Sequence, residues 1–366
     1  MVEPVKAKRM GNIELLRIVS MLLIICWHFG CHCIKIEDFD FTILGCFHWI
    51  VRSFANNAVN IYILISAYFL CRSSFKLNKL ISLIAEVWFY SVVIYTCMIT
   101  TNQTEFSFKS ALAVLLPVLS GSYWFASSYV LMYILAPFIN KCLDNITQKQ
   151  HLTLMAILLV SFSVIPNFLF FFQWINWGSS CGIVWMLVLY VVGAYLRRYV
   201  DLEQVKKQRK KYAMYTVLLC LSPFITKVVI AYISKAFTGE VIGSSLFYMN
   251  NSVLIVASSI AIFLLFSTLE ISGEISNNII RFIAPSTFAV YLIHDNVHIS
   301  NKLWGGVRGA MHLTDFRCIY EFFVVVLAIF CCCILIDLFR RMLFMAIKKT
   351  NVCIKLNDKI SNIKLL

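Results

Sequence analysis

Residues 11–34 read GNIELLRIVSMLLIICWHFGCHCI, an apolar run long enough to cross a bilayer as one helix. Three ionisable residues interrupt the run: Glu14, Arg17 and His28. Because each residue of an α-helix turns by about 100°, Arg17 and His28 share one face, and Glu14 lies on the same stripe. Ionisable side chains at membrane depth are costly and usually serve function. The stretch therefore predicts a membrane helix with a functional face.

The composition of the whole chain is also typical of a membrane protein. Of its 366 residues, 60% are hydrophobic and only 14% are charged, whereas a soluble domain carries about 25% charged residues. The net charge of +14 does not indicate nucleic acid, because the basic residues lie in loops between apolar segments and form no single patch. The fourteen cysteines lack the spacing of metal ligands, so we expect no metal site.

Hydropathy predicts an all-α, polytopic bundle of about ten transmembrane helices, each close to the length that a bilayer requires. The expected spans are 13–34, 50–71, 79–100, 123–142, 151–172, 181–200, 212–234, 247–268, 279–299 and 319–345. The segment 108–120 is shorter and contains Pro117, so we expect it to lie at the membrane interface.

The distribution of basic residues predicts the orientation. With the N-terminus inside, the inner segments hold 23 Lys and Arg and the outer segments hold 7. The positive-inside rule then places both termini in the cytoplasm. We expect residues 1–345 to form one transmembrane domain, and the basic, amphipathic tail 346–366 to lie along the lipids of the inner leaflet.

Two histidines are predicted to reach a similar depth. His28 lies fifteen residues into the first span and His294 fifteen residues into the ninth, and both spans run outward. A histidine can accept and return a proton near neutral pH, as a general base must. We expect His28, His294 and Asp295 to share a cavity. The alternatives are a histidine hydrogen-bonded within the bundle and an interfacial pair satisfied by water.

Other polar residues allow both structural and functional interpretations. Asn60 is a candidate substrate contact, but interhelical hydrogen bonding explains it equally well. Tyr123 and Trp124 are typical of the aromatic belt, or would stack on a sugar ring. Lys227 is expected to snorkel outward. The basic cluster within 197–211 is expected to anchor the topology, or to dock a polyanionic ligand.

Four stretches resemble the integral-membrane acyltransferase-3 family, in order along the chain. They are GNIELLRIVSMLLIICWHF at 11–29, NAVNIYILISAYFL at 57–70, YWFASSYVLMYILAPFIN at 123–140 and STFAVYLIHDNVHISNKLW at 286–304. The first holds the R-x10-H spacing of Arg17 and His28. One departure is Ala67, where many relatives have Gly.

The resemblance implies a bacterial enzyme of the inner (plasma) membrane. Such an enzyme moves an acetyl group from cytoplasmic acetyl-CoA to a sugar hydroxyl of an exported or cell-surface polysaccharide. His28 matches the essential histidine of the family, and Arg17 matches its essential arginine. Some relatives use succinyl or longer acyl groups, and some modify acceptors that are not sugars.

From these residues we expect the acyl donor to bind at the cytoplasmic mouth. Arg17 and the nearby basic residues Arg72, Lys76 and Lys79 would attract the phosphates of coenzyme A. Glu14 would hold Arg17 in place. The pantetheine arm would then follow the polar face of the first span through one tunnel to His28.

His28 would act as general base on the acceptor hydroxyl, or accept the acyl group transiently. Asp295 or His294 would orient it or balance its charge. The alternative function is a transporter or flippase for a lipid-linked sugar, with His28, Lys227 and Asp295 as a proton relay.

Overall fold

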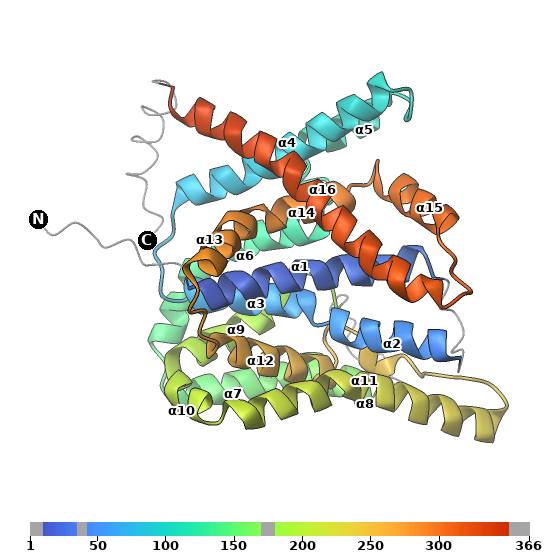
Figure 1. Cartoon of the computed structure of the whole chain (residues 1–366). Helices are drawn as coiled ribbons and strands as arrows, with labels where there is room; N and C mark the ends of the chain where they lie inside the picture. Colours follow the sequence, from blue (N-terminus) through green and yellow to red (C-terminus); the bar gives the residue numbers. More distant parts are fainter. Residues whose placement is uncertain (1–9, 35–41, 170–179, 351–366) are drawn as a thin grey trace, which may run out of the picture.

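The computed structural model describes residues 10–34, 42–169 and 180–350, and within these ranges the regular structure is helical (Figure 1). Its α-helices are α1 Gly11–His32, α2 Ile43–Ala55, α3 Ala58–Leu70, α4 Leu77–Thr100, α5 Phe108–Leu115, α6 Trp124–Asp144, α7 Gln148–Leu159, α8 Ile165–Phe168, α9 Ile183–Tyr199, α10 Leu202–Lys207, α11 Arg209–Thr238, α12 Val253–Ser267, α13 Glu274–Ile283, α14 Thr287–His294, α15 Ser300–Ala310 and α16 Arg317–Lys348. A π-helical turn, η1 Val160–Val164, and two 3₁₀ turns, η2 Leu246–Tyr248 and η3 Ala284–Ser286, join them.

The expected all-α membrane bundle is confirmed. Eight helical segments within the described ranges are long and apolar enough to cross a membrane. The two remaining expected spans are shorter or interrupted. The span at 181–200 is α9, with 17 residues, and the span at 279–299 is divided into α13 and α14 by the 3₁₀ turn that contains Pro285, because proline removes a backbone donor.

The first helix lies in the middle of the bundle, between two apolar cores (Figure 1). On one side, Ile25 and Phe29 pack in a core that includes residues of α4, α14 and α16. On the other side, Ile13 and Leu16 pack in a core with residues of α3, α9 and α12. An ionisable group on α1 is therefore surrounded by protein along much of its length, as its polar face requires.

The sequence predicts the second span as one continuous helix, but the structure divides it into two. It is interrupted between α2 and α3 at Asn56 and Asn57. The Asn57 amide donates to the Ser53 carbonyl oxygen (3.0 Å), and its side-chain oxygen accepts from the Ser259 hydroxyl (2.9 Å) on α12. Side-chain amides thus satisfy backbone and hydroxyl groups at the break, which is how interrupted membrane helices remain stable.

The helix α3 packs very closely on α9. A methyl group added to Gly193 would come within 2.6 Å of the Ala67 Cβ and 3.1 Å of the Leu64 carbonyl oxygen. Small residues allow this approach of two membrane helices. At the position where many family members have Gly, the Ala67 methyl is thus accommodated by a glycine on the facing helix.

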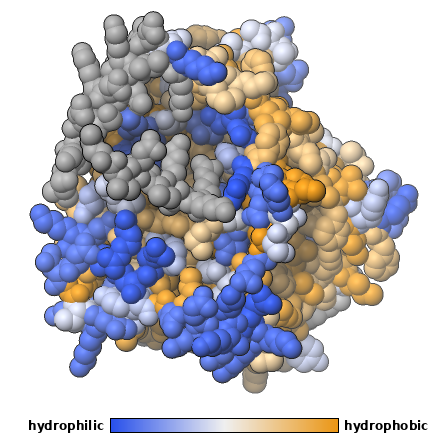
Figure 2. Space-filling model, turned by 60° about the vertical axis from the view of Figure 1, so that its left-hand side comes forward, coloured by the Kyte–Doolittle hydropathy of each residue, from blue (hydrophilic) through white to orange (hydrophobic). Residues whose placement is uncertain are grey.

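One end of the bundle carries many hydrophilic side chains (Figure 2). Figure 2 shows hydrophilic side chains gathered on the end where α1 begins and α10 lies, beside an apolar flank. This distribution agrees with the cytoplasmic end expected from the basic residues. The segment 108–120 includes the short helix α5, whose Phe108 is 78% exposed, and its interfacial position stays a prediction. The proposed tail, 346–366, lies largely outside the described residues, which end at residue 350.

Candidate active site

The break at η3 turns α14 so that His294 meets His28. The His28 Nδ1 and His294 Nε2 atoms are 2.8 Å apart, and the ring centroids are 5.0 Å apart. The other ring nitrogen of His294, Nδ1, lies 2.6 Å from the Val290 carbonyl oxygen. The two histidines, which we expected at a similar depth in two spans, are therefore in direct contact.

These contacts assign the ring protons. A carbonyl oxygen only accepts, so His294 Nδ1 donates to Val290. In a neutral His294 the Nε2 atom is then an acceptor, and His28 Nδ1 must donate to it. The neutral His28 consequently carries its lone pair on Nε2. A backbone carbonyl thus selects, through two rings, the nitrogen of His28 that can take up a proton.

Asp295 lies next to this basic nitrogen. Its Oδ1 atom is 3.6 Å from His28 Nε2. The Asp295 side chain is 22% exposed and that of His28 is 10% exposed, so the pair is only partly hydrated. A carboxylate at this distance stabilises an imidazolium more strongly than it would in bulk water.

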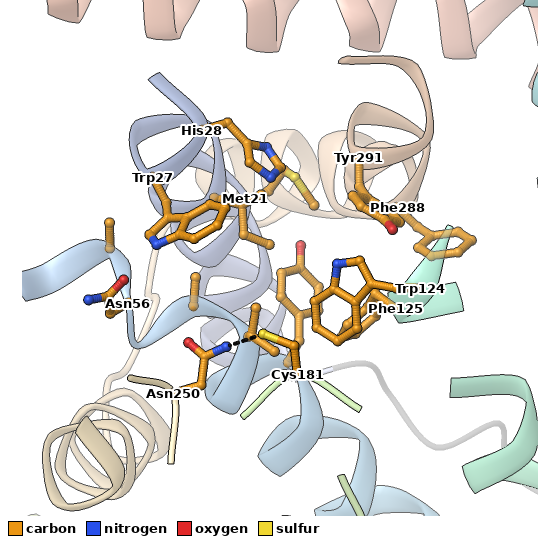
Figure 3. A pocket seen from close by; sticks show the side chains of 15 residues that line it. Met21, Trp27, His28, Asn56, Trp124, Phe125, Cys181, Asn250, Phe288 and Tyr291 are labelled. Atoms are coloured by element: carbon orange, nitrogen blue, oxygen red, sulfur yellow. Dashed lines mark hydrogen bonds between the residues drawn. The ribbon is translucent and has the colours of Figure 1, made fainter. Parts of the chain in front are cut away.

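His28 borders a pocket with several aromatic residues, in the half of the bundle that we expect to face outward. It contains about 690 Å³ of space free of protein atoms, which includes space open to solvent. Figure 3 shows Trp27, Met21 and His28 projecting from α1, with Trp124, Phe288 and Tyr291 across the pocket and Asn56, Cys181 and Asn250 along another side. Its described lining is Met21, Ile24, Trp27, His28, Ala55, Asn56, Ala58, Val59, Tyr62, Trp124, Phe125, Cys181, Asn250, Phe288 and Tyr291. We call this the outer pocket. Of the three residues that we expected to share a cavity, only His28 belongs to this described lining. His294, fully buried, and Asp295 lie outside it.

Arg17 borders a second pocket, nearer the end of the bundle that we expect to be cytoplasmic, with about 1340 Å³ of free space that includes space open to solvent. We call it the inner pocket. Its described lining is Met10, Ile13, Glu14, Arg17, Ser66, Phe69, Leu70, Ser73, Lys79, Leu80, Leu83, Tyr129 and Tyr133. The expected pairing is present, since Arg17 Nη1 donates to Glu14 Oε1 at 2.9 Å. The Arg17 side chain remains 31% exposed, so it can still meet a ligand.

Three aromatic rings lie between the two pockets. Tyr62 lines the outer pocket, and its hydroxyl donates to the carbonyl oxygen of Arg17 (2.9 Å). Phe125, also of the outer pocket, stacks on Tyr129 of the inner pocket with centroids 6.0 Å apart. We call Tyr62, Phe125 and Tyr129 the aromatic partition. Arg17 and His28, which we expected to line one tunnel, thus border two pockets on either side of it.

A protein-family model described as an acyltransferase domain matches residues 10–338. The chain belongs to the integral-membrane acyltransferase-3 family. The matched range holds the inner pocket, the outer pocket and the histidine pair. Comparisons with curated proteins and with solved structures found no match. The chain is thus a multi-pass membrane acyltransferase, a class that requires an acyl donor and an acceptor.

In this acyltransferase, the three residues expected to contact the acceptor have different positions. Trp124 lines the outer pocket. Asn60 lies outside the described lining, and its amide donates to the Asn250 carbonyl oxygen (2.7 Å) while its oxygen accepts from Trp185 (3.0 Å). Tyr123 is buried and donates to the Leu292 carbonyl oxygen (3.0 Å). Asn60 therefore supports the wall of the pocket, and Tyr123 supports α14.

Only some of the basic residues that we expected at the donor site line the inner pocket. Arg72 and Lys76 are exposed and lie outside the described lining of the inner pocket, whereas Lys79 belongs to that lining. Within the basic cluster, Arg198 forms an ion pair with Asp144 (2.8 Å) and its side chain is only 4% exposed. Arg198 thus joins two helices, which agrees with an anchoring role.

Lys227 does not snorkel, contrary to our expectation. It is 2% exposed, and its Nζ atom donates to the hydroxyls of Ser244 (2.9 Å) and Ser245 (3.0 Å). The segment that contains η2 supplies these hydroxyls, and sequence spacing gave no signal for that contact.

Proposed function

We propose that this acyltransferase moves an acetyl group from cytoplasmic acetyl-CoA to a sugar hydroxyl of an exported or cell-surface polysaccharide in the bacterial plasma membrane. The observation that carries the proposal is the basic Nε2 atom of His28 at an aromatic pocket, on the helix whose Arg17 borders a second pocket. One helix thereby connects a cationic donor site with a site for proton transfer.

The inner pocket fits the donor. Arg17 and Lys79 offer positive charge for the phosphates of coenzyme A, and Arg17 is held by Glu14. The free space of about 1340 Å³ exceeds that of the outer pocket, as a bulky nucleotide requires. Tyr129 and Tyr133 supply aromatic surface for a base.

The outer pocket fits a sugar acceptor. Trp27 and Trp124 provide rings that pack on the apolar face of a pyranose, and Asn56 and Asn250 provide amides for its hydroxyls. A hydroxyl that points at His28 Nε2 would donate to the ring lone pair. The acceptor would then be held on the side from which His28 can deprotonate it.

The proton balance of the transfer requires one base. His28 Nε2 takes the proton of the acceptor hydroxyl while that oxygen attacks the thioester carbonyl, and the C–S bond then breaks. His28 returns the proton to the departing thiolate, so no proton is gained or lost overall. His294 fixes the ring through Nδ1, and Asp295 stabilises the transient imidazolium. Transfer through an acyl-histidine would use the same Nε2 atom.

The aromatic partition must open for the two substrates to meet. Tyr62, Phe125 and Tyr129 lie between Arg17 and the His28 pocket. The thin pantetheine arm would pass between these rings, bringing the thioester from the inner pocket to the outer one. Closure at other times keeps water from the thioester.

The test uses the full chain in nanodiscs with radiolabelled acetyl-CoA and de-O-acetylated polysaccharide. We expect label transfer by the wild type and a fall of about 10²- to 10⁴-fold in His28→Ala, the usual contribution of a general base. The matched control is His298→Ala, a half-buried histidine outside the described lining. Both variants are checked for thermal stability. Undiminished transfer by a folded His28→Ala protein would overturn the proposal.

A further inference from the structure

The helix α6 begins at the outer pocket. Its first two residues, Trp124 and Phe125, belong to the described lining of that pocket. The first backbone hydrogen bond of the helix runs from the Ser127 N–H to the Tyr123 carbonyl oxygen (3.0 Å), and no side chain caps the helix. The N–H groups of residues 124–126 therefore donate to no carbonyl oxygen of the described chain. Such a helix end carries a partial positive charge that favours an anion.

A buried tyrosine hydroxyl lies at the same place. Tyr291 of α14 also lines the outer pocket, and it is 5% exposed. Its ring packs against that of Phe125 with centroids 6.0 Å apart, and its hydroxyl oxygen lies beside the Phe125 backbone N–H. No described group accepts the proton of this hydroxyl. A buried donor without an acceptor is destabilising, so this O–H group is available to a ligand.

Hydrogen bonds between the two helices hold these donors in place. The Tyr123 hydroxyl donates to the Leu292 carbonyl oxygen (3.0 Å) and accepts from the Asn296 side-chain amide (2.5 Å). The residue before α6 is thus bonded to the α14 segment on either side of His294. Donors that are fixed before a reaction need no reorganisation when charge develops beside them.

The partner of the base and the Tyr291 hydroxyl come from one short helix. Tyr291 precedes His294 by three residues, so their Cβ atoms are neighbours on α14, about 5–6 Å apart. His294 in turn contacts the His28 ring (2.8 Å). Figure 3 shows Tyr291 across the pocket from His28, with Trp124 and Phe125 on the same side as Tyr291. A carbonyl group held between them would have the base on one side and hydrogen-bond donors on the other.

We propose that the Tyr291 hydroxyl and the N–H groups at the start of α6 form the oxyanion hole of the acyl transfer. They would bind the negatively charged oxygen of the tetrahedral intermediate. This inference rests on the proposed function, in which His28 is the base and the donor is a thioester. It adds the group that stabilises the charge which the base creates.

The electron balance of the step is complete with these groups. The acceptor oxygen bonds to the thioester carbon while His28 Nε2 takes its proton, and the π pair of the carbonyl moves onto the carbonyl oxygen. Tyr291 and the N–H groups donate hydrogen bonds to this oxygen and keep their protons. When the pair returns to the carbon, the C–S bond breaks, and the thiolate receives the proton from His28.

The first test compares two analogues of acetyl-CoA that carry a CH₂ group between sulfur and carbonyl and so cannot transfer an acyl group. Trifluoroacetonyl-CoA hydrates to a tetrahedral form, whereas acetonyl-CoA remains a ketone. We expect the full chain in detergent to bind the first about tenfold or more tightly than the second, measured by calorimetry, because it resembles the tetrahedral intermediate. Tyr291→Phe should reduce this preference severalfold and leave the affinity for acetonyl-CoA unchanged.

The second test measures transfer from acetyl-CoA to the de-O-acetylated polysaccharide. Tyr291→Phe should lower kcat about a hundredfold, the usual cost of losing one donor of an oxyanion hole, and leave KM for acetyl-CoA unchanged. Its thermal midpoint should not fall, because the lost hydroxyl has no hydrogen-bond partner in the free protein.

The matched control is Tyr95→Phe. Tyr95 is also 5% exposed, lies outside both described linings, and donates from its hydroxyl to the Ser107 carbonyl oxygen (3.2 Å). This variant should lose stability and keep both kcat and the preference for trifluoroacetonyl-CoA. It thereby separates the loss of a structural hydroxyl from the loss of a catalytic one.

The outcomes distinguish this inference from the proposed function. Equal affinity of the wild type for the two analogues would overturn the oxyanion hole, as would an unchanged kcat in a folded Tyr291→Phe protein. Failure of both analogues to bind would reject coenzyme A as the donor and this inference with it. A retained preference for trifluoroacetonyl-CoA, without transfer to the polysaccharide, would count against the proposed acceptor and support the oxyanion hole.

Discussion

The inner and outer pockets differ in the ionisable side chains that line them and in how far these are exposed to water. The inner pocket contains Glu14 and Arg17 paired on one turn of α1, and it is wide and partly hydrated. The outer pocket is lined mostly by rings and aliphatic chains, and His28 is the imidazole in its described lining. A solvated cation suits a ligand that arrives from the cytosol, whereas an imidazole among rings suits proton transfer protected from water. Under the proposed function, the same helix would therefore serve donor binding at one end and proton transfer at the other.

After the loss of His28 itself, the largest expected effect comes from replacing His294, the residue that holds the His28 ring in place. Replacing His294 by Leu removes the acceptor for His28 Nδ1–H, so the ring can turn and can change tautomer. We expect kcat to fall by roughly 10²- to 10³-fold, within the range of acid–base contributions, while KM for the acceptor and affinity for coenzyme A stay unchanged. Steady-state kinetics and calorimetry measure these quantities.

The control for this variant is His298→Leu, which should keep kcat. If His294→Leu raised KM for the acceptor and left kcat intact, His294 would belong to acceptor binding, and its role as a positioning residue would be wrong.

The next largest effect is expected at the inner pocket, where loss of Arg17 should weaken donor binding but not acceptor binding. Arg17→Gln should weaken binding of coenzyme A by about ten- to a hundredfold, because a charge-assisted contact with phosphate is lost. Affinity for the acceptor should not change, since Arg17 lies across the aromatic partition from it. The matched control is Arg72→Gln, an exposed arginine outside the described lining. Equal donor affinity in Arg17→Gln and the wild type would remove Arg17 from the donor site.

A smaller effect is expected at the boundary between the pockets. Phe125→Ala would open the aromatic partition and let water reach the thioester. We expect a severalfold rise in hydrolysis of acetyl-CoA without acceptor, because closed active sites suppress such side reactions. The control Phe288→Ala enlarges the outer pocket away from the partition and should not raise hydrolysis. A Phe125→Ala protein with wild-type hydrolysis would show that other residues separate the pockets.

The parts of the molecule that the sequence predicted follow from local rules. The spans depend on hydropathy, which is a property of single segments. The Glu14–Arg17 pair depends on helical spacing alone. The similar depth of His28 and His294 follows from their positions in spans of the same direction, but their direct contact also requires α14 to pack beside α1, which hydropathy does not predict.

The parts that the sequence did not predict depend on distant partners. The break at Asn56 and Asn57 is stabilised by Ser259 of another helix, and it shapes one wall of the outer pocket. The burial of Lys227 depends on two serines of the η2 segment. The aromatic partition divides an expected tunnel through ring packing between α3 and α6. The Val290 carbonyl, which assigns the ring protons, carries no signal in sequence at all.

The smallest expected effect on activity tests the wall that both pockets share. The helix α3 contributes Tyr62 to the outer pocket and Ser66 to the inner one, and it is held by the close contact of Ala67 with Gly193. Gly193→Ala should destabilise the protein by about 1–3 kcal/mol through overpacking, seen as a lower thermal midpoint in detergent. Adding Ala67→Gly should restore only part of the stability, because the Leu64 carbonyl oxygen would remain close to the new methyl.

Since both pockets depend on α3, the affinities of Gly193→Ala for the donor and for the acceptor should decline together. A change confined to one pocket would show that α3 does not couple them.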